Sequence, residues 1–133
     1  MRIVRLFHDT QRDTSALELV DVPCDTAVTT EIAHSAQIPA VATFFREVTG
    51  AGEKGWHTAP FPQFIAVLKG GLKVEVSSGA SYTFQPGEVL LVEDVSGPGH
   101  RSWTFSGRFL HIQIPFGTDV LSTTSGTSRP LEI

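Results

Sequence analysis

Short runs of alternating apolar and polar residues, separated by turn-forming residues, make up most of the chain. Residues 72–76 show the pattern most clearly, because their apolar side chains share one face while Lys73 and Glu75 share the other. Gly70 and Gly71 precede this run and suit a tight hairpin turn, since glycine accepts positive φ angles. The same pattern predicts strands at residues 3–7, 17–22, 41–48, 64–69, 72–76, 82–84, 88–93, 101–105 and 109–114.

This series of strands predicts an all-β protein. No convincing amphipathic helix separates the strands, and 12 glycines and 8 prolines among 133 residues suit many turns. Such a series folds as a closed barrel or a double-sheet jelly roll, and the length fits a single domain over residues 1–133 with its barrel core at about 41–114. Residues 1–40 are expected to supply two outer strands and an irregular segment, and residues 50–55 a flexible turn. Residues 117–133 are expected to form a tail that is loosely held or lies on a neighbouring subunit.

Composition and charge argue against several classes of function. Ten basic and fourteen acidic residues give a net charge of −4, and no segment gathers Lys and Arg, so nucleic acid is not an expected partner. Cys24 is the only cysteine, which excludes an internal disulfide and a zinc site built on thiolates and favours a reducing, cytoplasmic location. We find neither a signal peptide nor an apolar run of membrane-spanning length, so no membrane partner is expected.

The residues with the clearest chemistry are His57, Gln63 and His100. A neutral imidazole offers a nitrogen lone pair to a metal, and an amide oxygen is a weaker ligand because it brings no charge. Ala59 has no donor atom, although its position two residues after His57 would bring a ligand to the same point. The three residues could hold a divalent cation loosely, or they could form hydrogen bonds with each other or with an organic ligand in the mouth of a barrel.

Together with the glycines and prolines around them, these residues give the chain a resemblance to the cupins over roughly residues 41–114. The first cupin motif has a glycine, His-x-His, a Glu or occasionally Gln, and a glycine. The second has a glycine, a turn with Pro and Gly, and a histidine. The chain is most similar to small bacterial single-domain cupins with an RmlC-like jelly roll, and the matching residues are Gly52, His57, Gln63, Gly70, Gly79, Pro86, Gly87 and His100.

The resemblance implies a double-stranded β-helix with a site at the barrel mouth. It also implies a metal site that in the family often has three histidines and a glutamate, whereas Ala59 and Gln63 stand here in place of one histidine and the glutamate. We therefore expect a small organic molecule as ligand, and a divalent metal (Fe, Mn, Ni, Zn or Cu) would be held weakly by His57, Gln63 and His100. The alternative is a metal-dependent enzyme of the dioxygenase, isomerase, lyase or cyclase type, because one barrel supports many chemistries.

Further pocket residues are assigned by alternation and residue type. One or two of the aromatic residues Trp56, Phe61, Phe64, Trp103 and Phe105 are expected to line the pocket, although aromatic residues of small barrels more often pack in the core. His111 lies on a predicted strand, on the face it shares with Phe109 and Gln113. The other face of this strand is purely aliphatic, and that aliphatic face is the better core candidate. His111 therefore either joins the site as a replacement metal ligand or lies away from it.

Charged residues near the second motif are assigned structural roles. Glu93 and Asp94 are adjacent on a strand and would point to opposite faces, so a place at a loop edge is expected for them. Arg101 follows His100 and would point away from it, toward a salt-bridge partner. The outer strands could also pair between two copies of the chain, so we expect a homodimer.

Overall fold

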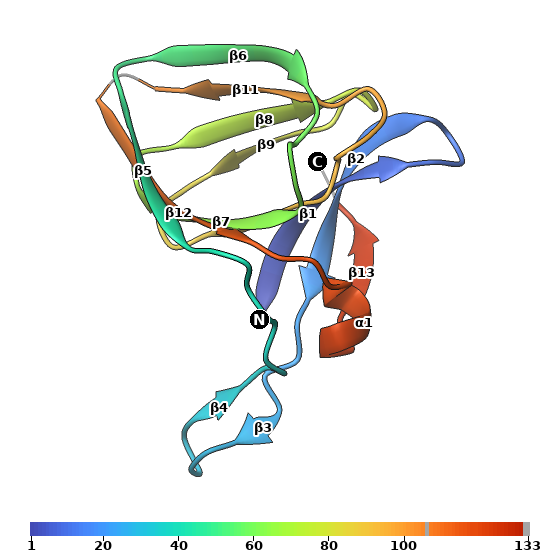
Figure 1. The fold of residues 1–133 in the computed structure, drawn as a ribbon, viewed down its shortest axis with the longest axis vertical. Coiled ribbons are helices and arrows are strands. Elements are labelled where there is room, and N and C mark those ends of the chain that lie inside the picture. The colour runs from blue at the N-terminus through green and yellow to red at the C-terminus, as the bar shows by residue number, and fades with distance from the viewer. Residues whose placement is uncertain (106, 132–133) are drawn as a thin grey trace.

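The computed structural model describes residues 1–105 and 107–131, and its regular secondary structure is almost entirely β-strand (Figure 1). A seven-stranded sheet and a four-stranded sheet form the body, and a separate two-stranded hairpin projects from it. The predicted all-β class is confirmed. In chain order the elements are β1 (Arg2–Asp9), β2 (Thr14–Asp21), β3 (Thr26–Ala27), β4 (Ala33–His34), β5 (Phe44–Thr49), β6 (Gly52–His57), β7 (Gln63–Lys69), β8 (Leu72–Val76), β9 (Ser81–Phe84), β10 (Val89–Val92), β11 (His100–Thr104), β12 (Arg108–Pro115), α1 (Val120–Thr124) and β13 (Thr127–Pro130).

Strands β5 to β12 wind as a jelly roll. β5 pairs with β12, β6 with β11, β7 with β10 and β8 with β9, so the first of these strands meets the last and the pairing continues inward. The pairs β7–β12 and β8–β11 then join these hairpin-like units into two sheets. This connectivity is the double-stranded β-helix that the sequence predicted.

The first and last segments extend the seven-stranded sheet. β1 runs parallel to β10 and antiparallel to β2, and β13 pairs with the far side of β2. The two predicted outer strands therefore extend a sheet of their own chain.

The expectation of a loose tail over residues 117–133 is wrong for the part that the structure describes. Asp119 caps α1 by accepting a hydrogen bond from the backbone N–H of Ser122, and the Val120 side chain is fully buried. α1 packs because it covers apolar side chains on the outer face of the seven-stranded sheet, and β13 then pairs with β2. Residues 132–133 of this tail lie outside the described residues.

The expectation of a flexible turn at residues 50–55 is also wrong. Most of this segment belongs to β6, an edge strand of the four-stranded sheet that pairs with β11. Gly52 and Gly55 contribute no side chain to either face of the strand. They therefore interrupt the alternation of apolar and polar residues from which a strand would be predicted.

Apolar side chains form two cores. The larger core lies between the two sheets and includes Leu6, Val74, Phe84 and Leu90, which are at most 2% exposed. The smaller core lies on the outer face of the seven-stranded sheet, where Leu91 and Val120 meet. Burial of a side chain of this size contributes about 1.5–3 kcal/mol, so the two cores stabilise the scaffold that holds the polar cavity described below.

The two faces of β12 are the reverse of what its aliphatic residues suggest. Phe109, His111 and Gln113 are buried and face the interior, whereas the aliphatic residues at 110, 112 and 114 are only half-buried. The expectation that the aliphatic face forms the core is therefore wrong. The interior accepts the polar face because it contains a cavity, in which a ring stack and an amide hydrogen bond accommodate these side chains.

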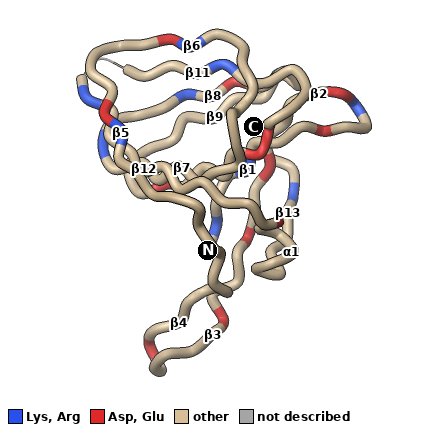
Figure 2. Tube along the Cα trace, viewed as in Figure 1, with Lys and Arg blue, Asp and Glu red and all other residues tan. Residues whose placement is uncertain are grey.

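Acidic and basic residues are interspersed along the chain (Figure 2). Among residues 1–105 and 107–131, no helix is long and apolar enough to span a membrane.

Candidate functional site

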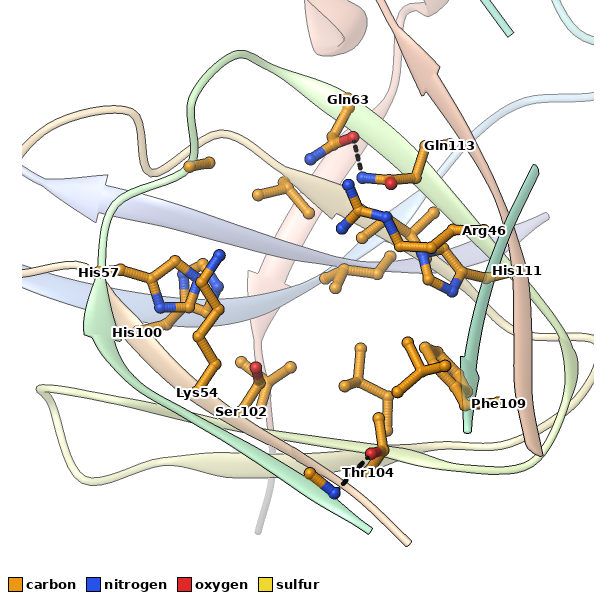
Figure 3. A pocket seen from close by; sticks show the side chains of 18 of the residues that line it. Arg46, Lys54, His57, Gln63, His100, Ser102, Thr104, Phe109, His111 and Gln113 are labelled. Carbon is orange, nitrogen blue, oxygen red and sulfur yellow. Dashed lines mark hydrogen bonds between the residues drawn. The ribbon is translucent and has the colours of Figure 1, made fainter. Parts of the chain in front are cut away.

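A cavity of about 430 Å³ opens between the two sheets at one end of the jelly roll (Figure 3). Two polar walls face each other across it. We call Lys54, His57, His100, Ser102 and Thr104, on β6 and β11, the imidazole wall, and Arg46, Gln63, His111 and Gln113, on β5, β7 and β12, the amide wall. The remaining lining is largely apolar and consists of Val48, Ala59, Pro60, Phe61, Ile65, Leu72, Val74, Leu90, Val92 and Phe109, together with Gly52 and Glu53.

His57 and His100 lie side by side on neighbouring strands. Their Cα atoms are register partners, and their ring centroids are 4.4 Å apart. The register between β6 and β11 shifts just beyond this pair, so that Lys54 is the partner of Ser102. Because of this irregularity three residues of β6 span two of β11, and both Lys54 and His57 reach the cavity although they are three positions apart.

Each of the two imidazoles has its Nδ1 atom engaged. His57 donates its Nδ1–H to the Gly55 carbonyl oxygen at 2.6 Å, and the Nδ1 atom of His100 lies 2.6 Å from Oδ2 of Asp94. These partners fix the tautomer in which Nδ1 carries the proton, so the Nε2 atom of a neutral ring keeps its lone pair. Both rings can therefore accept a hydrogen bond from a ligand or bind a cation through Nε2.

Asp94 is the residue that sequence reasoning missed. It lies at the start of the loop after β10, as expected, but its side chain is fully buried and bonded to Nδ1 of His100. Its backbone carbonyl also accepts a hydrogen bond from the Ala59 N–H, which links the turn after β6 to the end of β10. The spacing of six residues between an aspartate and a histidine is common in any sequence, so only the folded loop reveals the pair.

Gly99 allows the two histidine strands to come close together. Its φ angle is +76°, and a Cβ atom at this position would lie 2.2 Å from the His57 carbonyl oxygen. The Gly99 carbonyl accepts a hydrogen bond of 2.6 Å from the buried Ser15 hydroxyl, which fixes the loop from the other side. Only glycine fits here without moving β6 away from β11.

The environment lowers the pKa of His57. Burial is the main cause, the hydrogen bond to Gly55 opposes it, and the nearby His100 and Lys54 add to the lowering. The ring is therefore neutral near pH 7, which is the state that offers an Nε2 lone pair to the cavity.

The amide wall is more deeply buried than the imidazole wall. Gln113 donates from Nε2 to Oε1 of Gln63 at 2.6 Å, and both side chains are at most 5% exposed. The Oε1 atom of Gln113 and the Nδ1 atom of His111 are buried without a partner among the described residues. Burial, with a smaller effect from the positive charge of Arg46, lowers the pKa of His111 to about 4, so this ring stays neutral.

The structure places the three main predicted site residues around one cavity but not at one point. His57 and His100 are adjacent, whereas Gln63 lies on the opposite wall with its amide oxygen already bonded to Gln113 (Figure 3). His111 also lines the cavity, on the amide wall. Within residues 1–105 and 107–131, no three His, Cys, Asp or Glu side chains are grouped to hold a metal ion.

Of the aromatic residues predicted for the pocket, Phe61 lines the cavity, whereas the expectation for Trp56, Phe64 and Trp103 is wrong. Trp56 and Trp103 lie outside the cavity, where the Arg101 guanidinium stacks on both indole rings at 5.6 and 4.8 Å. Arg101 also forms the expected salt bridge, at 3.0 Å with Glu75. Phe64 packs against Phe116 in the smaller core. The aromatic residues that do line the cavity are Phe61 and Phe109.

Comparisons with known proteins find similarity to solved structures only, at low sequence identity. No family model matches the chain, and no curated protein matches it. Among solved structures, protein NMB1881 of Neisseria meningitidis is 18% identical and covers 65% of this chain and 89% of its own, with a TM-score of 0.44.

Two further structures carry the cupin name. A cupin-like protein of Thermotoga maritima is 15% identical, with coverage of 98% and 75% and a TM-score of 0.37. The Cupin_2 domain of an XRE family transcriptional regulator of Enterobacter cloacae is 14% identical, with coverage of 88% and 98% and a TM-score of 0.32. Similarities at this level do not specify a ligand, a metal or a reaction.

Proposed function

We propose that this protein binds a small organic molecule in the cavity between its two sheets. The observation that carries the proposal is the cavity itself, whose volume of about 430 Å³ lies within the range of about 300–1,000 Å³ for small-molecule sites. Its apolar lining and few polar groups are also typical of such sites. The Nε2 atoms of His57 and His100 would accept hydrogen bonds from a hydroxyl group of the ligand.

A resident divalent metal fits these residues poorly. Two Nε2 atoms are available on one wall, but the Gln63 oxygen is bonded to Gln113 and no carboxylate of the described cavity lining replaces it there. The cationic side chains of Arg46 and Lys54 also line the cavity, and their charge opposes that of a metal ion. We therefore expect any divalent ion to be held weakly.

A metal-dependent enzyme is the second candidate, and one observation favours it. The buried carboxylate of Asp94 on the Nδ1 side of His100 is the arrangement that commonly orients a metal-binding histidine. Metal analysis after growth with added Fe, Mn, Ni, Zn and Cu separates the two candidates. A stoichiometric metal that is lost in a His57→Ala/His100→Ala variant would overturn the metal-free proposal.

The binding proposal is tested by screening a small-molecule library with ligand-observed NMR. Ser102→Phe places a ring into the cavity from β11, so this variant should lose the compounds that bind wild type. Thr83→Phe is the matched control, because Thr83 is the register partner of Lys73 and faces outward on β9. If the same compounds bind Ser102→Phe and wild type, the ligand site is not this cavity.

The predicted homodimer stays a prediction. The outer face of the sheet next to β5 presents apolar side chains to solvent, including Phe45, which is 78% exposed, and Leu68, which is 51% exposed. Light scattering at micromolar concentration tests it, and a monomer there would contradict it.

A further inference from the structure

We infer that the ligand of the cavity carries a carboxylate, which Arg46 and Lys54 bind from opposite walls, and an apolar body that occupies the rest of the space. The inference rests on the proposed function, because it names the chemical class of ligand for the same cavity. It follows from the positions of the two cations in the cavity lining and from the apolar residues that make up most of the remaining lining.

Arg46 is the cation of the amide wall. It lies on β5 as the register partner of His111, and its side chain extends toward Gln113 and His111 (Figure 3). Its side chain is exposed and forms no ion pair with any residue of the described chain, so the guanidinium group is available to a ligand. A guanidinium group next to a cavity and without a carboxylate partner can bind a ligand carboxylate through two parallel hydrogen bonds.

Lys54 is the cation of the imidazole wall. Its side chain extends along β6 toward the two imidazoles (Figure 3), and its ammonium group has no ion-pair partner within residues 1–105 and 107–131. The charge of Lys54 contributes, after burial, to the lowered pKa of His57, as Arg46 does for His111. Both polar walls are thus under a positive potential.

The negative charges near the cavity do not cancel this potential. Asp94 is bonded to His100 beneath the ring. Glu53, the one carboxylate residue among the cavity lining, is the register partner of Trp103, whose ring lies on the outer face of the sheet with Lys73 and Arg101. The chain has a net charge of −4, so the positive lining is a local property of this cavity.

Most of the remaining cavity lining is apolar. This part of the lining includes Ile65, Leu72, Val74, Leu90, Val92 and Phe109. An aliphatic or aromatic body fits such a surface through removal of apolar area from water. A ligand with both parts would place its acid group at the two cations and its apolar body on these residues.

The test uses compounds in matched sets of three, each set consisting of a carboxylic acid, the primary alcohol and the primary amine of one skeleton. Phenylpropionate, phenylpropanol and phenylpropylamine form one such set, and octanoate, octanol and octylamine form another. Affinities are measured by ligand-observed NMR and calorimetry with the full chain. We expect the acid of a set to bind at least about tenfold more tightly than its alcohol, and the amine to bind most weakly.

Charge-removing variants identify the binding groups. Arg46→Gln and Lys54→Gln should each weaken acid binding about tenfold and leave alcohol binding within about twofold of wild type. Arg108→Gln and Lys73→Gln are the matched controls, because these residues lose the same charge outside the cavity. Thermal unfolding of all four variants shows that the fold is retained.

Each outcome decides one of the two proposals. If alcohols or amines bind as tightly as acids and Ser102→Phe abolishes their binding, the cavity binds small molecules but the carboxylate inference fails. If acids bind preferentially and the control variants weaken them as much as Arg46→Gln and Lys54→Gln, general surface charge is responsible and the inference also fails. If no member of any set binds wild type, the proposed function and the inference both fail.

Discussion

The two polar walls of the cavity use the same kinds of residue in different ways. On the imidazole wall, the Nδ1 atoms of His57 and His100 are held by oxygen partners, and the rings keep Nε2 for the cavity. On the amide wall, His111 is stacked on Phe109 with an unpartnered Nδ1 atom, and the two glutamines bond to each other.

This difference shows that a histidine in a cavity is not a binding group by residue type alone. A ring becomes a binding group when the structure fixes its tautomer and leaves the other nitrogen accessible, as Gly55 and Asp94 do. A ring that is buried without a partner mainly makes stability depend on pH. The two walls can therefore be distinguished by experiments on stability.

The largest effect is expected for His100→Ala. The substitution leaves the fully buried Asp94 carboxylate without its partner, and an uncompensated buried charge costs about 3–5 kcal/mol. Urea denaturation of wild type and variant measures the change in the free energy of unfolding. Addition of Asp94→Asn to His100→Ala should recover part of the loss, and a cost below about 1 kcal/mol for the single variant would contradict a tightly coupled pair.

Acidification is expected to destabilise the protein through His111. Its pKa is lowered from 6.5 to about 4, so between these values the unfolded chain binds a proton that the folded chain does not. Stability is therefore highest above pH 6.5 and should fall by about 3 kcal/mol on the way to pH 4 from this ring alone. The lowered pKa of His57 acts in the same direction.

Denaturant titrations over this pH range check the prediction. His111→Leu should flatten the dependence of the free energy of unfolding on pH, whatever its effect at neutral pH. An unchanged slope in His111→Leu would show that another group carries the pH dependence.

A smaller effect is expected for the glutamine pair. Gln63→Leu or Gln113→Leu leaves the other amide buried without its partner, at a cost of about 1–3 kcal/mol. The double variant should cost less than the two single variants combined, because no orphaned amide remains. Strictly additive costs in a double-mutant cycle would show that the 2.6 Å hydrogen bond contributes little.

The smallest effect is expected for His57→Ala. This ring is only half-buried and bonds to the carbonyl of a residue in its own strand, so its loss should cost less than about 1 kcal/mol. Binding of the alcohols in the cavity should nevertheless weaken, because they lose one Nε2 acceptor for their hydroxyl group. A cost as large as that of His100→Ala would remove the distinction between the two imidazoles.

The strand pattern predicted the jelly roll because alternation is a local property. Residues 72–76 alternate strictly and form β8 as expected, and the spacing of the two motifs identified His57 and His100, which lie side by side. Both predictions depend on the order of residues along the chain. The strand β6 was not predicted, because its glycines interrupt the alternating pattern.

Other parts of the site depend on tertiary contacts that no local pattern encodes. Asp94 reaches His100 only because the loop at Gly99 folds back, and Gln113 finds Gln63 only across two paired strands. Trp56 and Trp103 were expected in the pocket as aromatic residues, but alternation along strands with an irregular register turns both outward onto Arg101. The face that a strand presents to a cavity is set by bulges, which are not visible as a sequence period.

Gly99 has a consequence for genetic screens of this protein. It contributes no side-chain atom to the cavity. A Cβ atom at this position would nevertheless lie 2.2 Å from the His57 carbonyl oxygen, a clash that would push the neighbouring strand outward. A screen for loss of binding should therefore recover alanine or serine at position 99 as readily as changes at the histidines. Such alleles would keep every chemical group of the site and fail only because the groups stand too far apart.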